Sequence, residues 1–403
     1  MIRTETMYKN FKLFDGETPE IQNDAWFVVD SEKGEITDLG FGADTPKSDK
    51  VVDLEDKYVM PGLINAHTHI MMNPISNKLN YLSEAEVTFT ALQNLKELLK
   101  TGVTYIRDCG CAFDVDIKLA KLQAEGQLDG TEIIPSGRPM SMTGGHGDFT
   151  EGLNGETTWG NLVDSEDEMR KAVRQEFKLG AKNIKVMATG GVMSATDQID
   201  DTELTESEIA VAVEEAHSKH MTVAAHAEGA NGIHNAIVAG VDSVEHGSYI
   251  TDEDIQLMLK QGTYLTPTLI AAYTIPEYGE GKLPQYMIDK ANSFIDTFFK
   301  RIGVAIKAGV KITLGTDAGT PFNGFKDVPY ELELLTKVGA TNTQALFASS
   351  QNSAKLLGID DKYGTLKKGK VADFLVLNDD PVADVRAVQQ TDKSVYKKGV
   401  KVF

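Results

Sequence analysis

Eight apolar or β-branched segments follow one another along the 403-residue chain, and each ends in polar residues or glycine before a stretch with helical periodicity. The segments end at His67 to His69, Ile106 to Asp108, Ile134 to Ser136, Lys185, His226, His246, Thr266 to Thr268, and Asp317. Strands that alternate with helices form a parallel sheet, and eight such units close a (β/α)8 barrel. The sequence therefore predicts an α/β fold with a TIM barrel over residues 61–362.

The expected crossover helices carry start signals of their own. Ser165 and Thr205 are each followed three residues later by glutamate, which is the spacing of a capping box. The longest irregular region, residues 271–284, follows the seventh segment and contains Gly, Pro and Tyr. A barrel loop of this length is often a lid over the site, so we expect a loop that covers the strand ends.

Both ends of the chain fall outside the alternation of strands and helices. Residues 1–60 and 363–403 contain short strand patterns separated by turn signals such as Asp15-Gly16 and Lys398-Gly399. Because chain termini of compact proteins commonly lie close together, we expect these two segments to pair. They would form one small β-sandwich domain beside the barrel.

Composition excludes several classes of partner. An apolar fraction of 41% and a charged fraction of 25% are ordinary for a globular protein, and no apolar run approaches the ~18 residues of a membrane helix. The net charge of −20 disfavours nucleic acids and anionic lipids. The start MIRTETMYKNFKLFDG lacks the order of a secretory signal, and the two cysteines, Cys109 and Cys111, suit reduced thiols, so a cytoplasmic location is expected. The oligomeric state stays open, a homo-oligomer included.

His67 and His69 lie two residues apart, and on a strand this spacing points both imidazoles to the same side. Such a pair alone is more often a surface or chance occurrence than a metal site. Here His226 and His246 end the fifth and sixth segments, and Asp317 ends the eighth, so all five side chains should meet at the C-terminal face of the barrel. Nitrogen and oxygen ligands with room for water are typical of a catalytic zinc-type centre, which predicts a hydrolytic metal site.

Lys185 is unexpected at the end of a buried strand, because burial next to cations disfavours a charged ammonium group. The segments PGLINAHTHI, IKVMATGGVMS, HAEG, SVEHGS and GTDAG resemble the amidohydrolase superfamily, in particular its prolidase-like and imidazolonepropionase-like branch. KKGKVADFLVLNDDP resembles the terminal sandwich of that family. In relatives with this pattern the lysine of strand four carries a carbamate, derived from carbon dioxide, that bridges two divalent metals.

The resemblance implies a role for each matching residue. The implied ligands of two divalent ions, with zinc the expected metal, are His67, His69, Lys185, His226, His246 and Asp317. The first two histidines would hold the more buried ion, the last two the more exposed one, and the lysine both. Asp317 would complete the buried site, orient a bridging hydroxide, take its proton on attack and pass it to the leaving amine.

Four further residues are candidate substrate contacts. His146, in the glycine-rich loop SMTGGHGD that relatives also carry, is a second catalytic candidate that could polarise the scissile carbonyl or bind a carboxylate. Arg107 and Arg138 are the nearest cations for a carboxylate, although barrel arginines in structural ion pairs are about as frequent. Glu228, two residues after His226, would face a cationic group of the substrate. Packing or solvent-facing roles are expected for His217, His220 and His234.

These features predict a metal-dependent amidohydrolase that cleaves an amide or peptide bond of a small substrate, such as a dipeptide or an N-acyl amino acid. Glu228 stands where the prolidase-like relatives have tyrosine, which argues against Xaa-proline specificity. One alternative is hydrolysis of a cyclic amide, as by imidazolonepropionase, but members of that type lack the bridging lysine. A non-catalytic scaffold of the same fold is another alternative, against which the intact ligand set argues.

Overall fold

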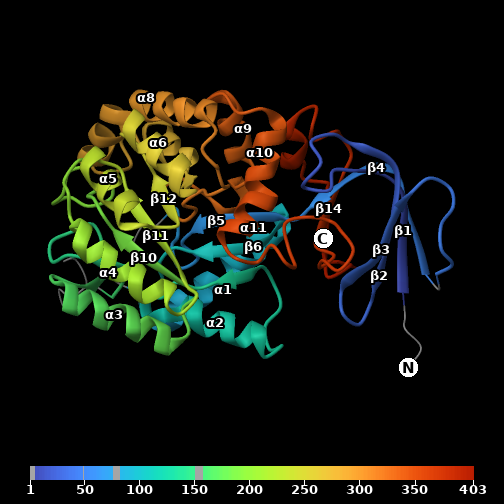
Figure 1. Cartoon of the computed structure of the whole chain (residues 1–403), viewed down its shortest axis with the longest axis horizontal. Helices are drawn as coiled ribbons and strands as arrows, with labels where there is room; N and C mark the ends of the chain where they lie inside the picture. Colours follow the sequence, from blue (N-terminus) through green and yellow to red (C-terminus); the bar gives the residue numbers. More distant parts are fainter. Residues whose placement is uncertain (1–4, 49, 76–81, 150–157) are drawn as a thin grey trace.

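The protein consists of a TIM barrel and a smaller β-sandwich domain beside it (Figure 1). The structure, a computed structural model, describes residues 5–48, 50–75, 82–149 and 158–403. Residues 1–4 and 49, which belong to the predicted N-terminal segment of the sandwich, lie outside the described residues. In the part of the chain that the structure describes, no helix is both long and apolar enough to span a bilayer.

Strands from both ends of the chain form the sheet of the sandwich domain, in the order β16-β15-β14-β4-β1-β2-β3. Their bounds are β1 Glu5–Leu13, β2 Gln22–Asp30, β3 Glu35–Phe41, β4 Lys50–Pro61, β14 Phe374–Leu377, β15 Ser394–Lys397 and β16 Val400–Lys401. Antiparallel pairing of β14 with β4, with Phe374 opposite Pro61 and Leu377 opposite Tyr58, joins the two ends. This confirms that the termini build one domain, while the exact domain bounds stay a prediction.

Seven parallel strands and one irregular segment form the barrel. The strands are β5 Leu63–Thr68, β6 Val103–Asp108, β7 Glu132–Ile134, β10 Asn183–Met187, β11 Thr222–Ala227, β12 Ser243–His246 and β13 Tyr264–Thr266, with the short β8 Met140–Ser141 and β9 Asn161–Leu162 beside β10. The eighth segment, residues 311–316, closes the ring by backbone hydrogen bonds: Thr313 donates to Leu265 (3.0 Å), and Ala66 donates to Leu314 (2.7 Å). The barrel is therefore confirmed, although β10 continues past Lys185 to Met187 and β11 continues past His226 to Ala227.

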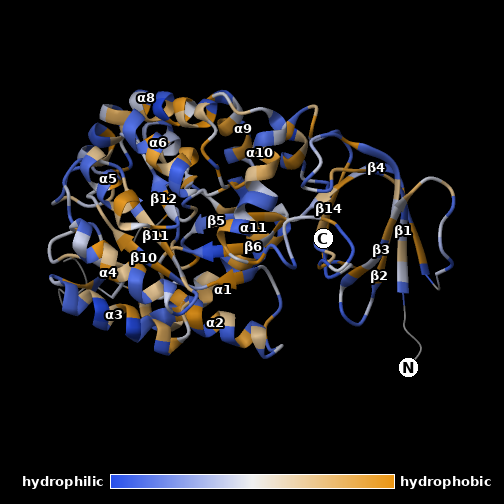
Figure 2. Cartoon of the chain, in the orientation of Figure 1, coloured by the Kyte–Doolittle hydropathy of each residue, from blue (hydrophilic) through white to orange (hydrophobic). Residues whose placement is uncertain are grey.

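Helices surround the barrel strands (Figure 1). They are α1 Glu84–Thr101, α2 Val115–Ala124, α3 Glu166–Leu179, α4 Glu206–His217, α5 Ala230–Ala239, α6 Asp252–Gln261, α7 Leu269–Tyr278, α8 Gln285–Ala308, α9 Tyr330–Lys337, α10 Asn342–Phe347 and α11 Ser353–Leu356, with 3-10 turns at Ala112–Asp114, Phe325–Asp327 and Val385–Gln389. A π-helical turn, Ala348–Asn352, links α10 and α11. Most helices carry both hydrophobic and hydrophilic residues, as expected for helices packed on one side against strands (Figure 2).

The predicted helix starts are largely confirmed. Thr205 and Glu208 form the reciprocal capping box of α4. At α3, the Ser165 hydroxyl accepts from the Glu168 N–H, but the Glu168 carboxylate accepts from the backbone of Asp164 instead of closing the box.

The region after the seventh strand differs from the expected irregular loop. Residues 271–284 lie mostly in α7 and in a short connection to α8, and α7 keeps its helical backbone through Pro276. Proline removes one helical hydrogen bond but is accommodated within this short helix. The cover over this side of the barrel is therefore built from helices.

Candidate metal-dependent active site

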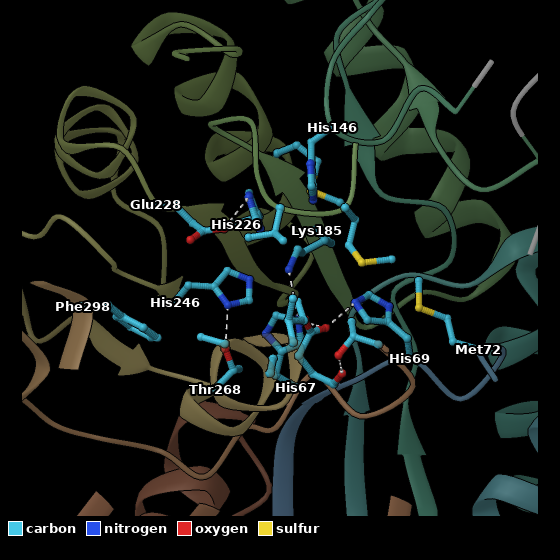
Figure 3. Close-up of a pocket in the computed structure, with 18 of the residues that line it drawn as sticks. His67, His69, Met72, His146, Lys185, His226, Glu228, His246, Thr268 and Phe298 are labelled. Atoms are coloured by element: carbon cyan, nitrogen blue, oxygen red, sulfur yellow. Dashed lines mark hydrogen bonds and ion pairs between the residues drawn. The ribbon is translucent and has the colours of Figure 1, made fainter. Parts of the chain in front are cut away.

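A cavity with about 740 Å³ of empty space, counted with the part that is open to solvent, lies at the C-terminal ends of the barrel strands. All six predicted metal ligands line it, together with His146 and Glu228, and Figure 3 labels each of these residues except Asp317. The six candidate ligands come from the ends of four strands, β5, β10, β11 and β12, and from the end of the eighth segment. The fold thus brings together residues as far apart in the sequence as His67 and Asp317, which are 250 positions apart. Arg107 and Arg138 are not among the described residues that line the cavity.

His67 and His69 are each held through Nδ1. Nδ1 of His67 donates to Oε2 of Glu245 (2.7 Å), and Nδ1 of His69 donates to the carbonyl of Gly110 (3.0 Å). A neutral imidazole whose Nδ1 carries the proton keeps its lone pair on Nε2. Both histidines are therefore prepared to ligate a metal through Nε2, in the way that partners of metal-bound histidines usually fix the tautomer.

His226 and His246 are anchored in the same manner. Nε2 of His226 donates to the carbonyl of Gly190 (3.0 Å), and Nδ1 of His246 shares a hydrogen bond with the Thr268 hydroxyl (2.6 Å). Burial, reinforced by neighbouring histidines, lowers the pKa of both rings well below 6.5. Each ring is therefore neutral at pH 7 and can offer its remaining nitrogen to a cation.

The donor atoms around Asp317 have the spacing of metal ligands. Its Oδ1 lies 3.2 Å from Nε2 of His69 and 3.4 Å from Nε2 of His67. Nζ of Lys185 lies 3.4 Å from the same His67 nitrogen, and ligand atoms of His67, His246 and Asp317 all lie within 4.8 Å of one another. Tetrahedral bonds of about 2.0–2.1 Å place ligand atoms about 3.4 Å apart, so these residues fit a divalent metal.

Asp317 also has an unusual pKa and an unusual backbone conformation. Burial raises its pKa, but hydrogen bonds and charges from His67 and His69 outweigh burial and hold that pKa well below 3.8. Asp317 and His246 both have left-handed backbones, with φ of 56° and 70°. Such conformations in non-glycine residues cost on the order of 1–3 kcal/mol and concentrate at functional sites.

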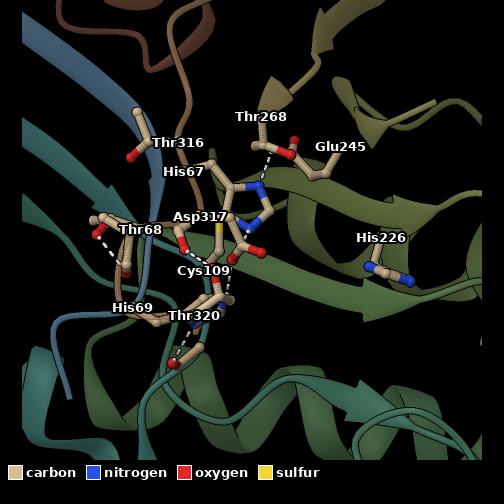
Figure 4. Close-up of polar contacts among 12 residues, drawn as sticks. His67, Thr68, His69, Cys109, His226, Glu245, Thr268, Thr316, Asp317 and Thr320 are labelled. Carbon is tan, nitrogen blue, oxygen red and sulfur yellow. Dashed lines mark hydrogen bonds and ion pairs between the residues drawn. The ribbon is translucent and has the colours of Figure 1, made fainter. Parts of the chain in front are cut away.

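Glu245 holds a candidate ligand of the site and was not predicted from the sequence. Besides holding His67 (Figure 4), it accepts a hydrogen bond from Nη2 of Arg107 (2.7 Å) and one from Ser243. Burial raises the pKa of Glu245, but Arg107 and His67 lower it to about 2. A carboxylate inside the apolar strand SVEH was the available signal, because a buried charge needs partners.

Glu245 also belongs to a second cluster of potential ligands, with His67 and Cys109. These groups lie on the Nδ1 side of His67, where the proton is donated to Glu245. Burial raises the pKa of the Cys109 thiol to about 12, so its sulfur stays protonated, and it points to the carbonyl of Ala66. This cluster therefore holds His67 from the Nδ1 side of its ring and does not form a metal site of its own.

The predictions for Arg107 and Arg138 as substrate contacts are corrected by their positions. Arg107 is 0% exposed, and its guanidinium donates to the Ala66 carbonyl, Ser243 and Glu245 inside the barrel. Arg138 donates to the carbonyls of Trp159 and Gly160. The reason is direction: the Arg107 side chain on β6 points into the barrel interior and not out of its C-terminal end.

His146 lines the cavity and stacks on His226, with ring centroids 4.4 Å apart. Its Nδ1 lies 2.9 Å from Oδ2 of Asp197. Burial lowers the pKa of His146, but the hydrogen bond and charge of Asp197, with Glu203 and Glu228, raise it overall. Asp197 is 51 residues away in the sequence, so no local pattern could have identified this pair.

Glu228 also lines the cavity, and burial raises its pKa to about 7. Oε2 accepts from the Ser248 hydroxyl (2.7 Å), and Oε1 lies 3.8 Å from Nε2 of His226. Within the described part of the chain Glu228 forms no ion pair with lysine or arginine.

The remaining histidines lie elsewhere. His217, near the end of α4, is paired with Asp242, and His234 on α5 with Asp254, each at 2.9 Å. His220 follows α4 with φ of 59°. All three are away from the cavity, as predicted.

Apolar side chains form the rest of the cavity wall. The wall outside the histidine cluster contains Met72, Phe149, Trp159, Met187, Val192, Met193, Ala271, Ala272, Ile275, Phe294 and Phe298. Lys185 is the lone lysine or arginine among the described lining residues. The site thus combines the polar cluster at the strand ends with a largely apolar wall, which is the usual composition of a small-molecule pocket.

Comparison with known proteins gives consistent matches. The model of the amidohydrolase family matches residues 58–402. Ochratoxinase of Aspergillus niger is 30% identical over 422 aligned residues, which cover 97% of this chain and 85% of that protein. A solved structure of a Xaa-Pro dipeptidase with bound methionine in the active site is 31% identical, with a TM-score of 0.91 and coverage of 98% and 99%. Imidazolonepropionase of Rhizorhabdus wittichii is 23% identical over 383 residues, 87% of each chain.

Proposed function

The chain belongs to the amidohydrolase family, and on that premise we propose that it hydrolyses an amide or peptide bond of a small substrate with the help of two divalent metal ions. The expected substrates are dipeptides or N-acyl amino acids, and zinc is the expected metal. The observation that carries this proposal is the arrangement of four histidines, each held through one ring nitrogen, around Lys185 and Asp317.

Two ions would share these ligands. His67 and His69 would hold the first ion with Asp317, and His226 and His246 would hold the second. When bound, the ions supply Lewis acidity and lower the pKa of a water molecule towards neutrality. The chain contributes a ligand set with fixed tautomers, so little rearrangement is needed when the ions bind.

Lys185 fits this centre as a carbamate. The residue is 1% exposed, and among the described residues it forms no ion pair, so a charged ammonium would lack a counterion. In its neutral form Nζ can add to carbon dioxide, forming an N–C bond and releasing one proton. The product is a carbamate that shares one negative charge between two oxygens, so Lys185 would be able to serve as a ligand of both ions.

Asp317 and His146 would carry out the proton transfer and the polarisation of the substrate. Asp317 is anionic, so its carboxylate can take the proton of the attacking water and pass it to the leaving amine. The His146 ring, held by Asp197, lies on the wall of the same cavity and can donate a hydrogen bond to the scissile carbonyl.

The cavity wall also points to a class of substrate. Its apolar residues favour a bulky apolar group, for example a hydrophobic amino-acid side chain. Glu228 forms no ion pair with Lys or Arg in the described residues, which favours an ammonium group of the substrate at that position. Because the arginines point elsewhere, a free substrate carboxylate has no guanidinium to bind in the described lining.

A substrate screen tests the proposal. Purified, zinc-loaded protein should release free amino acids from a library of dipeptides and N-acyl amino acids, with those carrying bulky apolar groups cleaved fastest. The matched control is Asp317→Asn, which keeps the shape of the side chain but lacks a carboxylate to accept the proton. Activity confined to cyclic amides, or equal release by the variant, would contradict the proposal.

A further inference from the structure

One face of α8 contacts both the cavity and a neighbouring loop. Tyr286, Lys290, Phe294 and Phe298 are spaced four residues apart, so they lie on one side of this helix. Phe294 and Phe298 line the cavity, and the Tyr286 hydroxyl donates to the carbonyl of Met193 (3.1 Å). The helix that forms part of the apolar wall is thus attached to the segment that follows β10.

Lys290 makes the main part of this attachment. Its ammonium, on a residue 9% exposed, donates to the carbonyls of Gly191 (2.9 Å), Ser194 (2.8 Å) and Asp197 (2.6 Å) and to Oδ1 of Asp197 (2.9 Å). A buried ammonium is stable when its protons are all donated and a carboxylate neutralises its charge. Residues 191–197 therefore surround the ammonium group of Lys290.

The same loop determines the surroundings of His146. While Oδ1 of Asp197 binds Lys290, Oδ2 lies 2.9 Å from Nδ1 of His146. Gly191 packs so closely that a Cβ there would lie 2.5 Å from Cε1 of His146, so the loop has no room to shift towards the ring. Burial raises the pKa of Asp197, but His146 and Lys290 lower it to about 2, so the residue bridges both as a carboxylate.

We propose that Lys290 and Asp197 are positioning residues for His146. Lys290 fixes the loop against α8, and Asp197 then fixes the tautomer and the direction of the imidazole towards the substrate. Because Phe294 and Phe298 lie on the same helix, the apolar wall and His146 keep a fixed separation. The catalytic consequence rests on the proposed amide hydrolysis, whereas the effect on the His146 ring does not.

Kinetics of Lys290→Met and Asp197→Asn test the catalytic part. A displaced catalytic group costs about 100-fold in rate for a shift of about 1 Å, so kcat should fall on the order of 10- to 100-fold while KM changes much less. Lys300→Met, an exposed position on the same helix, should leave kcat unchanged. Lys290→Met combined with His146→Ala should be no slower than His146→Ala alone, and losses that multiply would overturn the proposal.

Nuclear magnetic resonance of protein labelled with ¹⁵N-histidine gives a readout that does not need turnover. The Nδ1–H signal of His146 is identified by its loss in His146→Ala. In Asp197→Asn and Lys290→Met this signal should shift or broaden by exchange with water, and in Lys300→Met it should stay in place. An unchanged signal in both test variants overturns the proposal. An inactive wild-type protein with the expected shifts would refute only the proposed amide hydrolysis.

Discussion

The substitution Glu245→Gln is expected to lower the free energy of unfolding by about 3–5 kcal/mol, because it leaves a buried guanidinium without its counterion. Arg107 and Glu245 are both 0% exposed and joined by a hydrogen bond of 2.7 Å. Glutamine has one acceptor oxygen, so it cannot satisfy both Arg107 and His67, which now bind separate oxygens of the carboxylate.

Urea unfolding in the presence of a chelator measures this loss without any contribution from bound metal. The double substitution Arg107→Met with Glu245→Gln provides the control. It removes the unpaired charge and leaves glutamine free to accept from His67, so a large part of the lost stability should return. If the double variant is as unstable as, or less stable than, the single one, the buried charge is not the cause.

The same substitution should weaken metal binding about 10- to 100-fold, since partners that orient a metal-bound histidine typically contribute that much. Competition with a chromogenic chelator measures the affinity. A matched control is Glu331→Gln, which changes another fully buried glutamate that accepts hydrogen bonds from the backbone of Leu269 and Ile270 and not from a candidate ligand. Unchanged affinity in Glu245→Gln would refute the view that Glu245 prepares His67 as a ligand.

Four further predictions concern the metal centre, the substrate and the buried Glu215 on α4. Elemental analysis after growth with ample zinc should find about two divalent ions per chain, and a content near one would contradict the two-ion centre. Lys185→Ala should lose most activity and regain part of it with a small carboxylic acid but not with bicarbonate; full activity without additive would exclude the lysine as a ligand. Glu228→Gln should lower kcat/KM far more for substrates with an ammonium near the scissile bond than for neutral ones, and equal effects would refute direct contact. Hydrogen bonds from Arg174, Lys219 and Arg170 hold the pKa of Glu215 below 4.5, so its contribution to the free energy of unfolding is present above pH 4.5 and is lost as the pH falls. The loss of stability caused by Glu215→Gln should therefore be smaller in acid. Equal losses at pH 7 and pH 3 would contradict this.

The convergence of the candidate ligands on one cavity could be predicted because the position of each depends on a local rule. A strand places residues two apart on one side, and a barrel collects its strand ends at one face, so His67, His69 and Asp317 needed no knowledge of the rest of the structure. The alternation of apolar strands and capped helices was equally local, as Thr205 and Glu208 illustrate.

The residues that were missed or misplaced depend on contacts between distant segments. Arg107 was assigned to substrate because it ends a strand, but its direction is set by Glu245, 138 residues away. Asp197 meets His146 only when two loops pack together. The region around Pro276 looked irregular because proline and glycine disfavour helices in isolation, whereas packing of α7 against α8 and α9 stabilises the helix.

The pairing of β14 with β4 has a consequence for biosynthesis. About 310 residues separate the two strands, so at ~5–20 residues per second the ribosome needs on the order of 15–60 s to supply β14 after β4 has emerged. During that time the edge Tyr58–Pro61 has no partner, although Val59 and Met60 are apolar. Charged residues at positions 55–57 precede this edge, and Pro61 offers no N–H, both of which discourage pairing with another nascent chain. These residues therefore protect the edge of β4 during synthesis, at a stage when β14 has not yet completed the sheet of the sandwich domain.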